Sequence, residues 1–212
     1  MNRQRRNLSI ALGVTALAAP LALRAQRSAG NYVVLKPELP VDAQGKIEVL
    51  EFFWYGCIHC YELEPLLETW LKKIPADVQF RRVPAVFNDP RFARDAAIFY
   101  ALEASGNLER LHRPLFDAIH RDALKTADGQ ALGQWLTKNG VDTKKFDEIG
   151  RSFTVQSKVR RAAQLSQAYN IEGTPAMAVH GRYTINTGAG HSGMLATVDS
   201  LVDQVRRAAP PK

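Results

Sequence analysis

The positions of apolar residues predict a strand, a helix and a second strand within residues 46–83. Residues 46–55 are rich in Val, Ile and aromatic side chains with few polar breaks, as expected of a buried central strand. Residues 57–74 carry apolar side chains spaced three and four apart, which form one face of a helix that Pro75 ends. The residues of that face are Leu63, Leu66, Leu67, Trp70, Leu71 and Ile74. A short strand at 78–83 follows, and this order implies a right-handed parallel crossover.

The rest of the chain adds a strand at 32–35, a long helical block at 90–170, a hairpin and a final helix. The breaks in the helical block lie near Gly106, Asp128-Gly129 and Asn139-Gly140. In the hairpin, residues 176–179 and 183–185 flank His180-Gly181-Arg182. The final helix, at 192–208, is amphipathic, and the inward side chains expected are Leu195, Val198, Leu201, Val202 and Val205.

This order of elements predicts an α/β fold with a small mixed sheet and an inserted all-helical subdomain. Residues 26–88 and 154–212 would form the α/β domain, and residues 89–153 the insertion. The chain has 212 residues, 46% of them hydrophobic and 23% charged, which is enough for one well-buried core. Only two cysteines are present, and this excludes a disulfide-rich scaffold.

The net charge of +7 is concentrated near the N-terminus, since the first 25 residues hold four arginines and no acid. Without those four arginines the excess falls from +7 to +3. A basic stripe with interleaved aromatic residues is absent from the sequence, so we expect no nucleic-acid partner.

Residues 1–25 have the pattern of a secretory signal peptide. Arg3, Arg5 and Arg6 precede an apolar run from Leu8 to Leu23, and small residues end at Ala25. The alternative is an uncleaved membrane anchor, but the run is short for a membrane span. Sec-type export would place both cysteines in an oxidising compartment.

Cys57 and Cys60 form a Cys-x-x-Cys pair at the junction between the predicted strand and helix. A structural disulfide across so short a loop would contribute only about 2 kcal/mol. Haem attachment needs a histidine directly after the second cysteine, where Tyr61 stands. We expect no metal site, because the remaining histidines show no paired spacing. A redox-active dithiol is the interpretation that this pattern favours.

The placement of the two cysteines predicts different roles for them. Cys57 would cap the helix, where free N–H groups and the helix dipole favour a thiolate, so it is the expected nucleophile. Cys60, one turn later, would be the resolving thiol. His59 would add a donor or a positive charge beside Cys57 and lower its pKa. A stabilised thiolate favours the reduced form, which indicates a disulfide donor rather than a reductant.

Two acidic residues lie close to this pair in the predicted fold. Glu51 interrupts the apolar strand, and Glu64 falls on the cysteine face of the helix. A buried Glu64 would have a raised pKa and could relay the proton of Cys60. The alternative is that Glu64 turns to solvent. Arg82, on the next strand, is the expected counter-charge for both acids.

Together these residues resemble the DsbA family of periplasmic thiol:disulfide oxidoreductases. The motifs that carry the resemblance are Glu51-Phe52-Phe53, Cys57-Ile58-His59-Cys60-Tyr61, Glu64 and Gly173-Thr174-Pro175-Ala176-Met177. The similarity covers about residues 31–208. It implies a thioredoxin-like fold with the helical insertion. It also implies a cis bond at Thr174-Pro175, whose backbone would pair with a bound peptide. One departure is Ile58, where the best-known members have proline.

The same resemblance implies roles for further residues and for partners. Glu51, Glu64 and Arg82 would correspond to the buried acid pair and its basic neighbour, where lysine is more usual. The Cys57–Cys60 disulfide would replace any separate cofactor. The expected function is donation of that disulfide to reduced, newly exported proteins by a periplasmic monomer. A DsbB-type membrane quinone reductase would re-oxidise it.

Other functions remain open. A thioredoxin-like reductant more usually carries Gly-Pro between its cysteines, and an isomerase of this fold would need an N-terminal dimerisation domain. A redox-inert peptide-binding chaperone could use the same groove.

Overall fold

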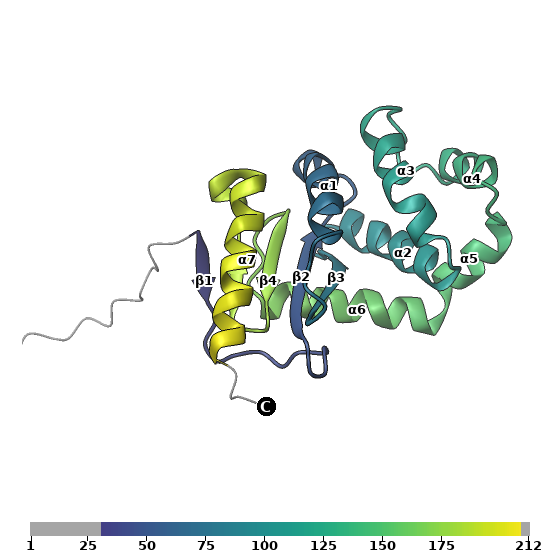
Figure 1. Cartoon of the computed structure of the whole chain (residues 1–212). Helices are drawn as coiled ribbons and strands as arrows, with labels where there is room; N and C mark the ends of the chain where they lie inside the picture. Colours follow the sequence, from purple (N-terminus) through teal and green to yellow (C-terminus); the bar gives the residue numbers. More distant parts are fainter. Residues whose placement is uncertain (1–30, 209–212) are drawn as a thin grey trace, which may run out of the picture.

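A five-stranded mixed sheet forms the centre of the computed structural model, which describes residues 31–208 (Figure 1). The predicted signal peptide therefore lies outside the described residues. The strands are β1 Tyr32–Val34, β2 Ile47–Phe53, β3 Val78–Pro84, β4 Ala176–Val179 and β5 Tyr183–Ile185. Their order in the sheet is β1-β5-β4-β2-β3, with β2 and β3 parallel and the other neighbours antiparallel. The predicted mixed sheet and parallel crossover are confirmed.

One side of the sheet is covered by α1 Ile58–Leu71 and α7 Gly190–Ala208, which contact each other. A short 3-10 helix, η1 Thr187–Ala189, leads into α7. The apolar core on this side joins both helices to the sheet, and it includes Val49, Leu63, Leu67, Met177 and Val198. All five inward residues expected in the last helix are buried.

The helical block forms five helices, and Figure 1 shows α2 to α5 gathered at the side away from α7 and β1. They are α2 Pro90–Ala104, α3 Leu108–His120, α4 Gly129–Lys138, α5 Thr143–Arg151 and α6 Phe153–Ala168. The side chains of Asp89, Asp128, Asp142 and Ser152 accept N–H groups where α2, α4, α5 and α6 begin. The last helix of the block, α6, contacts both α2 and β3.

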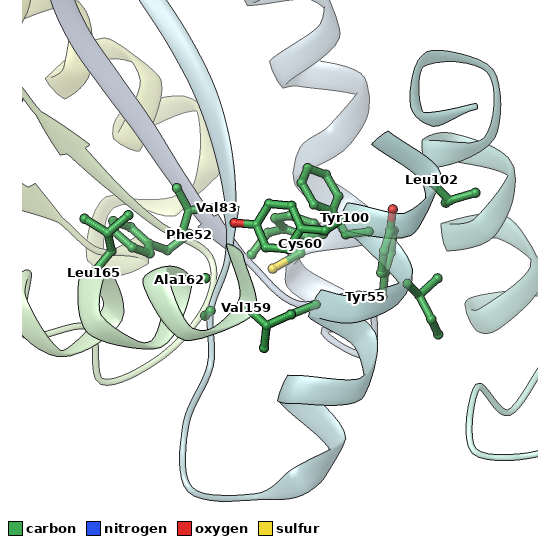
Figure 2. Close-up of a cluster of buried hydrophobic side chains, with 14 of the residues drawn as sticks. Phe52, Tyr55, Cys60, Val83, Tyr100, Leu102, Val159, Ala162 and Leu165 are labelled. Carbon is green, nitrogen blue, oxygen red and sulfur yellow. The ribbon is translucent and has the colours of Figure 1, made fainter. Parts of the chain in front are cut away.

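A second apolar cluster lies between the sheet and this helical block (Figure 2). Phe52 and Val83 from the sheet meet Val159, Ala162 and Leu165 of α6 in this cluster. Thus α6 covers the face of the sheet opposite α1 and α7. Cys60 belongs to this second cluster. The arrangement is the α/β fold with a helical insertion that the apolar pattern predicted, and it is the thioredoxin-like fold that the family resemblance implied.

Two details of the predicted first helix were wrong. The helix ends at Leu71, with Lys72 as its C-cap, rather than at Ile74. Leu66, expected on the apolar face, is 41% exposed. The face that the sheet and α7 cover is narrower than the apolar stripe, so it includes Leu63 and Leu67 but leaves Leu66 in solvent.

The alternation of side chains along β2 places Glu51 beneath α1. Ile47 and Val49 belong to the core beside α1 and α7, whereas Leu50 and Phe52 belong to the opposite cluster. Glu51 shares the side of Val49, because alternate residues of a strand face the same way. Its partner in the parallel register is Arg82 on β3. Of the helices within residues 31–208, none is long and apolar enough to cross a membrane.

Candidate active site

A tight turn after β2 places Cys57 at the start of α1. The Cys57 backbone N–H donates to the Trp54 carbonyl over 2.9 Å. Glycine suits position 56 in this turn, because a Cβ atom there would clash with the Trp54 ring. Cys57 has an extended backbone, with φ −89° and ψ 116°, and is the N-cap residue of α1. Its sulfur therefore lies where free helical N–H groups favour an anion.

The two thiols occupy different environments. Cys57 is partly exposed, whereas Cys60 is fully buried. A hydrogen bond from the Cys60 thiol is the largest influence on Cys57, and it lowers the pKa of Cys57 to about 5 against the opposing effect of partial burial. The Thr174 side chain and the backbone N–H groups of Cys60 and His59 lower it further. Burial raises the pKa of Cys60 well above its usual range, and the hydrogen bond to Cys57 adds to this.

The His59 imidazole is exposed and lies beside Glu62 and His191. Its Nδ1 lies 3.0 Å from Glu62 Oε2, and its ring centre lies 6.2 Å from that of His191. His59 influences the Cys57 pKa through a backbone hydrogen bond. The sequence-based expectation assigned this effect to the side chain, and the difference arises because His59 lies on the outer face of the first helical turn.

Thr174 and Pro175 face the cysteines from a distant part of the chain. The Thr174-Pro175 bond is cis, as the family resemblance implied, and Lys36-Pro37 is also cis. The Cys57 sulfur lies 3.3 Å from the Thr174 carbonyl oxygen, to which it donates only when it is protonated. Thr174 and Pro175 also line an open groove of about 350 Å³, together with residues of β1, β5 and η1. A peptide sulfur that reaches Cys57 would therefore meet this backbone and groove.

A buried ionic cluster lies behind the thiol pair. Arg82 Nη2 donates to Glu64 Oε2 over 3.0 Å, and Arg82 Nε lies 3.2 Å from Glu51 Oε2. Both acids are almost fully buried. Among residues 31–208, neither oxygen of Glu51 receives an aligned hydrogen bond. Arg82 is therefore the positively charged neighbour of both acids, but it donates an aligned hydrogen bond to Glu64 and not to Glu51.

Two residues that the sequence analysis missed complete this cluster. His112, on α3, places its Nε2 3.2 Å from Glu64 Oε1 and its Nδ1 2.9 Å from the Tyr55 hydroxyl. Burial lowers the pKa of His112, so the neutral ring donates to Glu64 and accepts from Tyr55. No local spacing marks His112, because its partners are 48 and 57 residues away in the chain.

The acid with the raised pKa is Glu51 and not Glu64, which corrects the prediction from the sequence. Burial raises the pKa of Glu51 to about 8, the nearby Glu64 charge adds to this, and Arg82 opposes it only in part. Burial also acts on Glu64, but the hydrogen bond from His112 and the charge of Arg82 outweigh it and lower the pKa of Glu64. Its oxygens are already held by Arg82 and His112, so Glu64 is poorly suited to relay a proton.

Known proteins are similar to this chain over almost its whole length. A family model described as a DSBA-like thioredoxin domain matches residues 48–198. The thiol:disulfide interchange protein DsbA of Bordetella pertussis is 45% identical over 202 residues, which cover 93% of this chain and 94% of that protein. DsbA of Pseudomonas aeruginosa is 38% identical over 210 residues, covering 96% and 99% of the two chains.

Comparison of the fold with solved structures also indicates the DsbA family. The crystal structure of Pseudomonas aeruginosa DsbA matches with a TM-score of 0.79 and 38% identity, and the match covers 84% of this chain and 94% of that one. A low-pKa thiol at a helix N-terminus and a buried second thiol are the groups that thiol–disulfide exchange requires. The chain therefore belongs to the DsbA family of thioredoxin-fold proteins and is a thiol:disulfide oxidoreductase.

Proposed function

We propose that this protein donates its Cys57–Cys60 disulfide to reduced, newly exported proteins in the periplasm. A DsbB-type membrane quinone reductase would then restore the disulfide. The signal-like segment at residues 1–25 and membership of the DsbA family support this location. The expectation that the protein acts as a monomer belongs to the same proposal.

The observation that carries the proposal is the contrast between the two thiols. Cys57 has a pKa of about 5 and is partly exposed, whereas Cys60 is buried with a raised pKa. At neutral pH the reduced protein therefore holds a Cys57 thiolate and a Cys60 thiol. Because folding stabilises that thiolate, the reduced form is favoured and the disulfide tends to accept electrons.

The exchange proceeds in two balanced steps. A substrate thiolate attacks the Cys57 sulfur, so a mixed disulfide forms, the Cys57–Cys60 bond breaks, and Cys60 leaves as a thiolate that takes up a proton. A second substrate thiolate then attacks the substrate sulfur of the mixed disulfide. A disulfide forms in the substrate, and Cys57 leaves as a thiolate, for which its low pKa makes it a good leaving group.

Glu51 is the best candidate to give that proton to Cys60. Its pKa of about 8 keeps it mostly protonated at neutral pH. Glu51 lies on the side of β2 that faces α1, the helix that carries Cys60, and when ionised it raises the pKa of Cys60. In the reverse reaction, Glu51 would accept the proton as Cys60 attacks the mixed disulfide.

The equilibrium with glutathione tests the proposal. We expect a reduction potential more oxidising than about −180 mV, the value typical of protein disulfide isomerase. A potential near about −270 mV, typical of thioredoxin, would instead identify a reductant.

Two further assays separate the remaining alternatives. A disulfide isomerase would rearrange scrambled disulfides faster than it oxidises a reduced peptide. A peptide-binding chaperone would still prevent aggregation of an unfolded protein after Cys57→Ser. We expect Cys57→Ser to abolish oxidation of the peptide.

His59→Ala should move the Cys57 pKa by less than about one unit, because the backbone N–H remains in place. Thr174→Val removes a hydroxyl that lowers the Cys57 pKa, and it should raise that pKa more than His59→Ala does. Titration of thiolate absorbance in both variants measures this. If the Cys57 pKa rose to about 8.5 in His59→Ala, the imidazole and not the backbone would control the thiolate.

Glu51→Gln should slow the attack of Cys60 on a trapped Cys57–peptide disulfide by about tenfold or more, because the proton acceptor is lost. The rate at which an added thiolate attacks the Cys57–Cys60 disulfide should change less. The variant should also be more stable near neutral pH. In the parent protein the Glu51 pKa rises from 4.5 to about 8 on folding, so stability is lost as pH rises through this range.

Stopped-flow fluorescence with Trp54 as reporter can follow this resolution step, and Glu68→Gln, an exposed acid on α1, is the matched control. Glu64→Gln gives the decisive comparison, because Glu64 is held ionised by its partners. Slow resolution in Glu64→Gln together with normal resolution in Glu51→Gln would assign the relay to Glu64.

A further inference from the structure

Three metal-binding side chains meet on the surface near the thiol pair. They are His59, Glu62 and His191, and their ligand atoms all lie within 4.8 Å of one another. His59 and Glu62 are exposed, and His191 is partly exposed. None of these three side chains takes part as a reacting group in the thiol–disulfide exchange described above.

The fold assembles this group from two helices. His59 and Glu62 are three residues apart on α1, so they lie on the same side of its first turns. His191 comes from the first turn of α7, 129 residues after Glu62 (191 − 62), and α7 packs against α1. Histidine spacing in the sequence indicated no metal site, because this contact depends on how the two helices pack.

The donor set suits a particular class of ion. Two imidazoles and one carboxylate match the ligands of zinc and similar divalent transition ions, whereas calcium and magnesium prefer oxygen ligands. His59 Nδ1 and Glu62 Oε2 are 3.0 Å apart. Ligands that each bind zinc at about 2.0–2.2 Å have a similar separation around a tetrahedral ion.

Little movement is needed to close the group around an ion. The His59 and Glu62 side chains are 65% and 52% exposed, so they can change rotamer without disturbing the core. The ring nitrogen of His191 lies at most 4.8 Å from the ligand atoms of His59 and Glu62, and it must move closer to them to share an ion. The open surface also leaves room for a water molecule as the fourth ligand.

We propose that His59, Glu62 and His191 bind one divalent transition ion, with zinc as the probe. The bound ion links the first turn of α1, which carries the thiol pair, to the first turn of α7. It stabilises the folded protein and holds these two helix ends together.

Isothermal titration of the oxidised, untagged protein with Zn²⁺ tests this site. The oxidised form is used because the Cys57–Cys60 disulfide removes both thiolates as ligands. We expect one ion to bind per chain. His191→Gln should weaken binding about tenfold or more, since loss of even an indirect partner costs that much at metal sites. Glu62→Gln should also weaken it.

Glu68→Gln is the control, because Glu68 is an exposed acid on the same helix outside the group. It should bind Zn²⁺ as the parent protein does. Thermal melting gives a second readout, and zinc at about 100 times its dissociation constant should raise Tm by about 5–10 °C. This increase should disappear in His191→Gln.

Absence of binding to the oxidised protein would overturn the proposal. Equal binding by His191→Gln would overturn it too, as would an equal loss in Glu68→Gln. None of these measurements involves a thiol substrate, so the result is independent of whether the protein is a disulfide donor.

Discussion

The reduced protein should gain about 2–3 kcal/mol of stability relative to the oxidised protein between pH 5 and pH 8. The cause is the Cys57 thiol, whose pKa falls to about 5 in the folded protein. An unfolded cysteine has a pKa of about 8.5, so the folded state binds fewer protons between these values. The stabilisation is therefore lost as pH falls through the folded pKa of about 5.

The size of this effect follows from the width of the pH range. Three pH units at about 1.36 kcal/mol each would give about 4 kcal/mol, and solvent screening of the partly exposed thiolate reduces this. A disulfide across so short a loop stabilises by only about 2 kcal/mol. The reduced form should therefore be at least as stable as the oxidised form by pH 8.

Urea unfolding of both forms at pH 5, 6.5 and 8, with a chelator present, measures the difference. Other titrating groups, including Glu51, occur in both forms and largely cancel. Cys57→Ser is the matched control, because it lacks the thiolate, and its stability should follow the pH dependence of the oxidised form. A constant difference between the two forms across this range would show that Cys57 is not stabilised as a thiolate.

Arg82→Met should destabilise the protein by about 3 kcal/mol or more at pH 7. Arg82 is the charged partner of both Glu51 and Glu64, and these acids are 0% and 1% exposed. Removal of one partner from a buried ionic cluster leaves an uncompensated charge, which typically costs about 3–5 kcal/mol.

The pH dependence identifies this mechanism. Arg82 lowers the pKa of both acids, so its loss raises the folded pKa of Glu51 further above its unfolded value and reverses part of the lowering of the Glu64 pKa. The destabilisation should therefore be smaller near pH 4.5, where the variant can protonate its buried acids at little cost, and should grow as pH rises. Urea unfolding at pH 4.5 and pH 7.5 can establish this.

Two further variants control this experiment. Arg91→Met breaks an exposed pair with Asp89 and should reduce stability much less than Arg82→Met does. Addition of Glu64→Gln to Arg82→Met should recover part of the stability, because it removes the buried carboxylate that loses its charged partner. A loss that is equal at both pH values and unaffected by Glu64→Gln would point to lost packing instead.

Much of the active site could be predicted because it is local in the sequence. Cys57 and Cys60 share one helical turn, and the strand before them and the helix after them follow from apolar spacing alone. An acid within an apolar strand was sufficient to single out Glu51. The position of Cys57 as N-cap depends on a few neighbouring residues and on the Gly56 turn.

The roles of the two acids could not be predicted in this way. Helical spacing placed Glu64 correctly near the cysteines, but its pKa depends on His112, which α3 brings from 48 residues away. Spacing also gave no indication of Thr174, which lies 117 residues from Cys57 and which only the family resemblance placed at the site. The exposure of Leu66 could not be predicted either, because it depends on how much of the α1 surface the sheet and α7 cover.

The amino-acid sequence thus specified the elements, the fold class and the reactive pair, because side-chain periodicity and helix capping act over a few residues. The packing of α3 against α1 determined which buried acid keeps its proton, and the packing of α7 against α1 brought His191 to His59 and Glu62. Ionisation and metal binding depend on distances between side chains in space, and residues far apart in the chain contribute to both.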